Sequence, residues 1–340
     1  MDIRKVIMVL KYIARRMIIM IPIILLVSMV VFFVIQLPPG DFVSTYIATL
    51  QEEGETVDMQ IIEDLREQYG LDKPLYVQYY KWMKGILTEG DFGYSFSYNK
   101  PVLDVIGERM GITLLISSLT MLFTYLVAIP IGIYSALRQY SFGDYVATII
   151  GFLGMATPNF LLAILLMFFS FKVFGDPMLG IMSAEYVDAS WSLAKVFDLA
   201  KHLIIPVIVI GTGSTCGLIR VMRGQMLDEL DQQYVLTGRS KGLSEKKIRN
   251  KYVVRAALNP IASSIGWSLT GIFTGSTITA IVLNLPTQGP VMYAALRSQD
   301  MYLAGSWLLM MAVLTVIGTL ISDIMLAWLD PRIRLMDKRM

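Results

Sequence analysis

The chain has 340 residues, of which 55% are hydrophobic and 16% are charged, and its mean hydropathy is +0.59. A soluble domain typically carries about 25% charged residues, so the composition excludes an ordinary soluble protein and predicts a polytopic membrane protein. The net charge of +2 does not point to nucleic acid, because the basic residues cluster beside apolar segments. The single cysteine, Cys216, forbids an internal disulfide, and no His, Cys and carboxylate cluster has the spacing of metal ligands.

The N-terminal part contains a basic segment, an apolar run and an acidic segment. Residues 1–16 are basic, and residues 17–37 form an uncharged run long enough to cross about 30 Å of hydrocarbon. The run ends in QLPPGD without the small-residue cleavage pattern of a signal peptide, which predicts a retained span and a cytoplasmic N-terminus. Residues 38–111 hold thirteen Asp or Glu against six Lys or Arg. With helices expected at Met59–Tyr69, from Pro74 onward and at Pro101–Met110, this segment predicts a small helical extracytoplasmic subdomain.

Five further apolar segments predict an all-α protein with six membrane spans. They lie at residues 112–137, 145–173, 202–219, 261–283 and 303–329. Pro158 is expected to kink the third span, residues 174–201 to form an outer loop, and residues 283–302 a short outer turn. The positive-inside rule places residues 138–144, 220–260 and 330–340 in the cytoplasm. The run GTGSTCG in the fourth span lacks the GK[ST] ending of a phosphate loop, so it predicts helix packing and no ATP binding.

The polar stretch from Asp228 to Pro260 is the longest in the second half of the chain. Its composition predicts a helix from Asp228 to Lys241, a left-handed corner at Gly242, and a second helix that Ser244 caps and that runs to about Leu258. The stretch carries seven basic and four acidic residues, which indicates a cytoplasmic loop between two spans.

This stretch also carries a resemblance. The run YVLTGRSKGLSEKKI resembles the cytoplasmic EAA loop of bacterial ABC importer permeases, above all the dipeptide, oligopeptide and nickel subfamily, whose loop typically reads Y-x-R-T-A-R-A-K-G-L. The matching residues are Tyr234, Thr237, Arg239, Lys241, Gly242 and Leu243; Gly238 and Ser240 replace the usual alanines. The segment from REQYGLDKPL to GITLL and the closing DPRIR are also typical of that subfamily.

The resemblance implies a type I ABC importer permease fold in the plasma membrane of a bacterium or archaeon, with both termini in the cytoplasm. It also implies partners: a second permease, two ATP-binding subunits that hold ATP and Mg, and an extracytoplasmic solute-binding protein. This chain itself would hold no cofactor, no metal and no catalytic residue, and would work by alternating access. The loop from Tyr234 to Ser244 would contact an ATPase subunit, with Arg239 and Lys241 meeting acidic or carbonyl groups and Leu243 filling an apolar notch. Oligopeptides are the expected substrate; oligosaccharides or a nickel chelate are alternatives, and a stand-alone secondary transporter or channel is a remote one.

Two further sets of residues lie inside predicted spans. Gly271, Gly275 and Ser276 form a small face, which predicts either packing within the chain or close contact with the second permease. Asp323 lies in the last span, where a carboxylate usually has a partner. We expect a structural ion pair with Arg220 or Arg223; a proton relay is the alternative.

Overall fold

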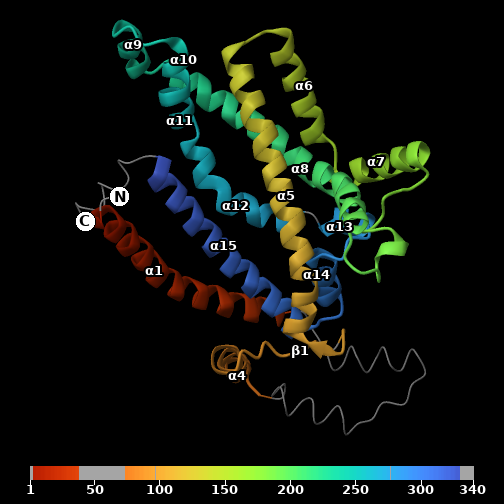
Figure 1. The fold of residues 1–340 in the computed structure, drawn as a ribbon. Coiled ribbons are helices and arrows are strands. Elements are labelled where there is room, and N and C mark those ends of the chain that lie inside the picture. Colours follow the sequence, from red (N-terminus) through yellow and green to blue (C-terminus); the bar gives the residue numbers. More distant parts are fainter. Residues whose placement is uncertain (1–2, 38–72, 96, 276, 330–340) are drawn as a thin grey trace. The chain divides into compact units, whose positions relative to one another are not determined.

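The computed structural model describes residues 3–37, 73–95, 97–275 and 277–329, and the chain divides into two compact units (Figure 1). Unit 1 comprises Met1–Ile13, Ile112–Pro286 and Thr315–Met340, and unit 2 comprises Ala14–Gly111 and Thr287–Leu314. The long helices α1 (Ile3–Ile35), α5 (Val102–Leu137) and α15 (Met301–Leu329) each contribute residues to both. The predicted helix at Met59–Tyr69 and the closing DPRIR lie outside the described residues.

Unit 2 is helical apart from one short hairpin in its described part. Its further elements are α4 (Leu75–Thr88), β1 (Tyr94–Ser95), β2 (Lys100–Pro101) and α14 (Gln288–Arg297). Pro74 precedes α4 as predicted, and Trp82 of α4 stacks on Phe32 of α1 at 5.6 Å between ring centroids. The predicted short outer turn is wrong, because ten of its residues form α14. Val291 and Ala295, one turn apart, are buried with Val105 in one apolar cluster, and this packing stabilises the helix.

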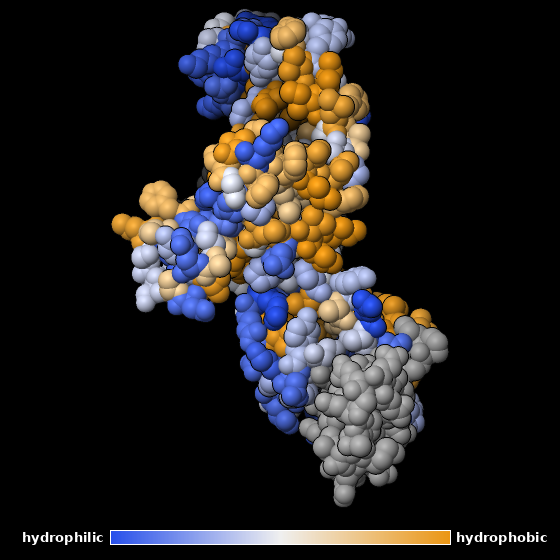
Figure 2. Space-filling model, turned by 90° about the vertical axis from the view of Figure 1, so that its right-hand side faces the viewer, coloured by the Kyte–Doolittle hydropathy of each residue, from blue (hydrophilic) through white to orange (hydrophobic). Residues whose placement is uncertain are grey.

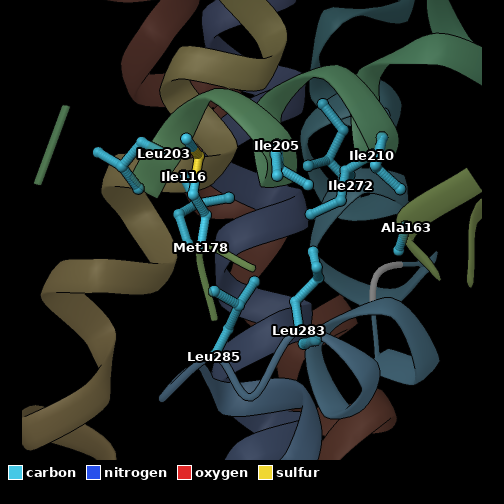
Figure 3. Close-up of a cluster of buried hydrophobic side chains, with 11 residues drawn as sticks. Ile116, Ala163, Met178, Leu203, Ile205, Ile210, Ile272, Leu283 and Leu285 are labelled. Carbon is cyan, nitrogen blue, oxygen red and sulfur yellow. The ribbon is translucent and has the colours of Figure 1, made fainter. Parts of the chain in front are cut away.

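Unit 1 is built around α8, which packs against α6 and α7. Its further elements are α6 (Phe142–Ala156), α7 (Asn159–Phe174), η1 (Ala184–Tyr186), α8 (Leu193–Leu230), α9 (Gln233–Ser240), α10 (Glu245–Ile248), η2 (Arg249–Val253), α11 (Val254–Ala257), α12 (Asn259–Gly275) and α13 (Thr277–Val282). One buried cluster joins Ile116 of α5, Ala163 of α7, Ile210 of α8 and Ile272 of α12 (Figure 3). Cys216 is buried within α8, as expected for a small apolar residue, and the run GTGSTCG is helical.

The third predicted span is broken rather than kinked. Helix α6 ends at Ala156, α7 begins at Asn159, and the two axes differ in direction by 104°. Pro158 has no N–H to continue the ladder, and its ring disfavours a helical conformation at the preceding residue. Thr157 accordingly has an extended backbone. The segment therefore turns sharply between two helices.

Three other boundaries also differ from the prediction. The short helix from Pro101 and the span from residue 112 are one helix, α5, because Val102, Val105 and Ile106 are buried along one face and no proline lies at the junction near residue 111. Helix α8 is longer than its span at both ends, so parts of the predicted outer and cytoplasmic loops are helical. Ser192 caps its start by accepting the backbone N–H of Lys195.

The described helices account for most of the predicted spans. Four are long and apolar enough to cross a membrane by themselves, namely Ala14–Ile35, Val102–Leu137, Leu193–Leu230 and Met301–Leu326, and the bent pair α6–α7 makes a fifth if it is one span. The predicted span at residues 261–283 corresponds to α12 and α13, and Ser276 between them lies outside the described residues. The six-span count therefore stays a prediction.

Candidate functional site

The predicted glycine corner is present at the end of α9. Gly242 has a φ of +72°, in the left-handed region that favours glycine. Its N–H donates to the carbonyl of Arg239 at 2.9 Å, and the N–H of Leu243 donates to the carbonyl of Gly238 at 3.1 Å. These two bonds form a Schellman motif, which satisfies the last carbonyls of the helix. The left-handed conformation predicted for Gly242 is confirmed.

The helix that precedes the corner is shorter than predicted. Instead of one helix from Asp228 to Lys241, α8 ends at Leu230 and α9 begins at Gln233. The break lets the two buried residues of α9, Val235 and Gly238, turn toward the protein interior. The hydroxyl of Tyr234 donates to the Glu229 carboxylate across the break at 2.6 Å. Burial, together with this carboxylate, raises the pKa of Tyr234, so the phenol stays neutral and remains a donor.

Residues 233–257, which we call the coupling segment, share a hydrophobic core with α8. Val235, Ile248 and Val253 are buried in one cluster with Met222 and Met226 of α8. The Arg249–Val253 stretch is a π-helix, which the sequence analysis missed. Its extra residue places Ile248 and Val253, five positions apart, on the same buried face. The predicted second helix is thus confirmed as one helical run, but Ser244 at its start makes no side-chain capping bond.

Two residues of the predicted contact surface face inward. A Cβ at Gly238 would lie 3.3 Å from the side chain of Ile248, so glycine in place of the usual alanine relieves a tight contact between α9 and α10. Leu243 is half-buried against the same core, so only part of its side chain is open to a partner, and the expectation that it fills a notch on an ATPase stays a prediction. The exposed apolar residue of α9 is Leu236, with 52% of its surface accessible. It stands where the typical loop has an arginine, and that departure was the signal that could have identified it.

The outward surface of the corner is polar and largely cationic. Thr237, Ser240, Lys241 and Ser244 are exposed. Arg239 is exposed as well, but it binds Glu245 through Nε at 2.7 Å and Nη2 at 3.3 Å. This hydrogen-bonded pair lowers the pKa of Glu245. The acidic residue of the second helix is therefore engaged within the segment. Hydrophilic side chains gather over the part of unit 1 that Figure 1 labels α9 and α10 (Figure 2).

The predicted ion pair of Asp323 with Arg223 is wrong. Arg223 binds Asp144 instead, through Nε at 2.9 Å and Nη2 at 3.0 Å. Arg220 lies over the ring of Phe152, with its guanidinium carbon 5.3 Å from the centroid. A pairing of Asp323 with Arg220 stays a prediction. Sequence reasoning missed Asp144 because it assigned this residue to a cytoplasmic turn 79 positions away from its partner.

The predicted small face of α12 is not where this helix approaches α15 most closely. No heavy atom of a neighbouring element lies within 4 Å of a Cβ built at Gly271, which is exposed. The close approach of α12 to α15 occurs one turn and a half earlier, where a Cβ on Gly266 would lie 2.5 Å from the backbone of Gly318. Ser276 lies outside the described residues. Packing within this chain thus uses Gly266, and contact of Gly271 with a second permease stays a prediction.

Comparison with known proteins identifies the family. The family model described as "Binding-protein-dependent transport system inner membrane component" matches residues 128–335, and the model of the N-terminal part of such components matches residues 9–120. The chain belongs to this family. It is 34% identical to the oligopeptide transport system permease protein AppB of Bacillus subtilis over 326 residues, which cover 95% of this chain and 98% of that protein. It is 29% identical to the dipeptide transport system permease protein DppB of Alkalihalophilus pseudofirmus, over 96% of this chain and 99% of that protein.

The family assignment confirms the expected class of protein. The permease is a helical, multi-pass membrane protein and a subunit of a binding-protein-dependent ABC importer. Such permeases operate with other components of an ABC transporter, and its relatives are transport permeases rather than enzymes. The coupling segment lies within the part of the chain that the first family model matches.

Proposed function

We propose that this permease and a second permease form the path by which oligopeptides enter the cell, driven by two ATPase subunits. The observation that carries the proposal is the construction of the coupling segment. Its outward surface of Leu236, Lys241 and neighbouring polar residues is fixed by the Gly242 corner and by a core shared with α8. A partner that grips this surface would move α8 with it, because Met222 and Met226 are fully buried in the same core.

The mechanism we infer is alternating access. ATP and Mg bound by the partner ATPases would close the ATPase pair, and each ATPase would carry a coupling segment with it. The resulting rigid-body motion would open the path toward a loaded solute-binding protein on the outer side, and hydrolysis would reset it. The cytoplasmic placement of the segment and of both termini follows from the distribution of lysine and arginine.

The oligopeptide substrate is supported by the relatives and by the chemistry of the spans. AppB, DppB and OppB of Haemophilus influenzae, which is 29% identical over 328 residues, carry oligopeptide or dipeptide transport in their names. The predicted spans at residues 112–137 and 261–283 contain no charged residue. An uncharged path suits solutes with a neutral backbone and side chains of many kinds. Oligosaccharides and a nickel chelate are the competing cargoes.

Reconstituted transport tests the proposal. The complete importer, with its two permeases, ATPases and binding protein, would be placed in proteoliposomes and offered a tritiated pentapeptide, a labelled maltopentaose and a nickel–histidine chelate in turn. We expect ATP-dependent accumulation of the peptide alone, and none when the binding protein is omitted. Accumulation of the sugar or the nickel chelate without the peptide would overturn the assignment of oligopeptides as the substrate. Peptide uptake by the permeases without ATPases would overturn the importer mechanism.

A further inference from the structure

The carboxylate of Asp144 is the meeting point of three segments of unit 1. It is 3% exposed and accepts two bonds from Arg223 of α8, one from the hydroxyl of Ser135 near the end of α5, and one from the N–H of Tyr140 at 2.9 Å. Each carboxylate oxygen thus has two donors, which fills its acceptor capacity. The bidentate geometry of the arginine fixes both the distance and the orientation of the two elements.

The same carboxylate holds a turn in an unfavourable conformation. Tyr140, in the connection between α5 and α6, has a φ of +62°, in the left-handed region that is costly for a residue with a side chain. Its N–H is the group that donates to Asp144. The turn therefore depends on this contact for its shape, and α6 begins directly after it at Phe142.

On the other side, Arg223 belongs to the part of α8 that carries the coupling segment. Its neighbours Met222 and Met226 are fully buried against residues of α9, α10 and η2. The guanidinium is only about one quarter exposed, with 26% of the side chain accessible. A displacement of the coupling segment is consequently transmitted to Arg223 through packed side chains.

Asp144 lies in the first turn of α6, which leads into α7. Helix α6 lies along α8, and after the 104° turn α7 packs on α13 (Figure 1). Ala163 of α7 belongs to the same buried cluster as Ala280 of α13 and Leu283 directly after it. Helices α6 and α8 pack closely near the end of α6, where a Cβ on Gly154 would lie 2.6 Å from the Sγ of Cys216, and the ion pair fixes their register near its start. The pair thus fixes the orientation of α6 on α8, and through α8 it connects the coupling segment to α6 and α7.

We propose that Asp144 and Arg223 are positioning residues that make α6 and α7 follow the coupling segment when the ATPases move. The inference rests on the proposed function, because it assigns the pair to the coupling of ATP hydrolysis to transport. It goes beyond it by assigning a role to an internal ion pair that lies outside the coupling segment. A pair that only held the fold together would change the amount of importer and leave the coupling of each assembled complex unchanged.

The test uses the complete importer in proteoliposomes and three variants. The double variant Asp144→Asn/Arg223→Gln replaces the ions by amides that still hydrogen-bond, and Arg223→Lys keeps the charge but loses the bidentate geometry. The matched control, Asp176→Asn/Lys201→Gln, removes an ion pair of 3.1 Å between Asp176, which follows α7, and Lys201 of α8. Three quantities are measured per assembled complex: basal ATP hydrolysis, its stimulation by the binding protein, and uptake of the tritiated pentapeptide.

We expect the double variant to keep its ATPase subunits and basal hydrolysis, while stimulation by the binding protein and uptake fall about fivefold or more, the lower range of coupling between distant sites. Stimulation and uptake by Arg223→Lys should lie between those of the double variant and the wild type. The control should match the wild type in both quantities. Unchanged stimulation and uptake per complex would overturn the proposal. So would a failure of both pair variants to assemble while the control assembles, since the pair would then be structural. If the wild type takes up no peptide, the substrate proposal fails, while stimulation by the binding protein still reports on the pair.

Discussion

Substitution of Gly242 separates the conformation of the corner from the chemistry of its surface. No heavy atom lies within 4 Å of a Cβ built at this residue, so a new side chain meets no obstacle within the chain. The cost within the permease is therefore backbone strain alone, about 1–2 kcal/mol for an ordinary residue in the left-handed region. The two bonds of the Schellman motif contribute about 0.5–1.5 kcal/mol each. Strain and bonds are of similar size, so an alanine at this position would leave the corner only partly populated.

Three variants give a graded series. Gly242→Asn is expected to keep the corner, because asparagine tolerates the left-handed region better than other residues with a side chain. Gly242→Ala should lose about fivefold or more of the corner population, and Gly242→Asp should lose more of it than Gly242→Asn does. The aspartate carboxylate lies beside the negative end of α9, which costs a further ~0.3–1 kcal/mol. Asparagine and aspartate have the same shape, so their difference isolates charge.

The assay is co-purification of the ATPase subunits with each permease variant, followed by ATP-driven uptake. Membrane insertion should be normal in all variants, because the spans do not depend on this residue. We expect ATPase retention and uptake to be highest in the wild type, lower in Asn, and lower again in both Ala and Asp. Equal retention and uptake by the wild type and Gly242→Asp would refute the coupling role and favour a basic helix that lies on the inner leaflet. A loss in Asn as large as in Asp would show that bulk at the surface matters and backbone conformation does not.

Three other predictions concern packing, pH and the contact surface. Gly266→Ala should lower the melting temperature in detergent by overpacking α12 against α15, at a cost of about 1–3 kcal/mol, whereas Gly271→Ala should not. Equal melting temperatures of the two variants would contradict this packing. Burial raises the pKa of Asp300, so stability should fall as pH rises from about 4 toward that raised value, and Asp300→Asn should abolish this part of the pH dependence of melting. Leu236→Asp should release the ATPases from a permease of normal stability, whereas Leu243→Asp should destabilise the permease itself; the opposite pattern would identify Leu243 as the contact.

The features predicted correctly are those with a local cause. Gly242 requires only that one residue adopt a left-handed backbone, and the residues on either side are compatible with helices. Pro158 disfavours a continuous helix, so a disturbance at this point was predictable. The complete break and its angle were not, since Pro130 and Pro206 lie inside the continuous helices α5 and α8. The angle depends on how α7 packs on α8 and α13, which are distant in sequence.

The errors arise where distant segments decide the outcome. The partner of Arg223 could not be chosen by hydropathy, because Asp144 and Asp323 both lie near ends of apolar segments that the sequence places on the cytoplasmic side. The π-helix of η2 exists because Ile248 and Val253 must reach one core, and an ordinary helical period would turn Val253 away from it. The partial burial of Leu243 was not predicted, because the motif alone does not show which side of the corner faces α8.

These corrections change the chemistry expected of the ATPase surface. Two acidic residues near the corner are occupied within the chain, since Glu229 accepts from Tyr234 and Glu245 binds Arg239. Lys241 and Leu236 are both exposed, and these two acids compete less with a partner for the lysine. Protein interfaces commonly place an apolar centre within a polar rim. The complementary surface on the ATPase should accordingly offer an apolar recess for Leu236, on the outer face of α9, with acidic groups at its edge toward Lys241.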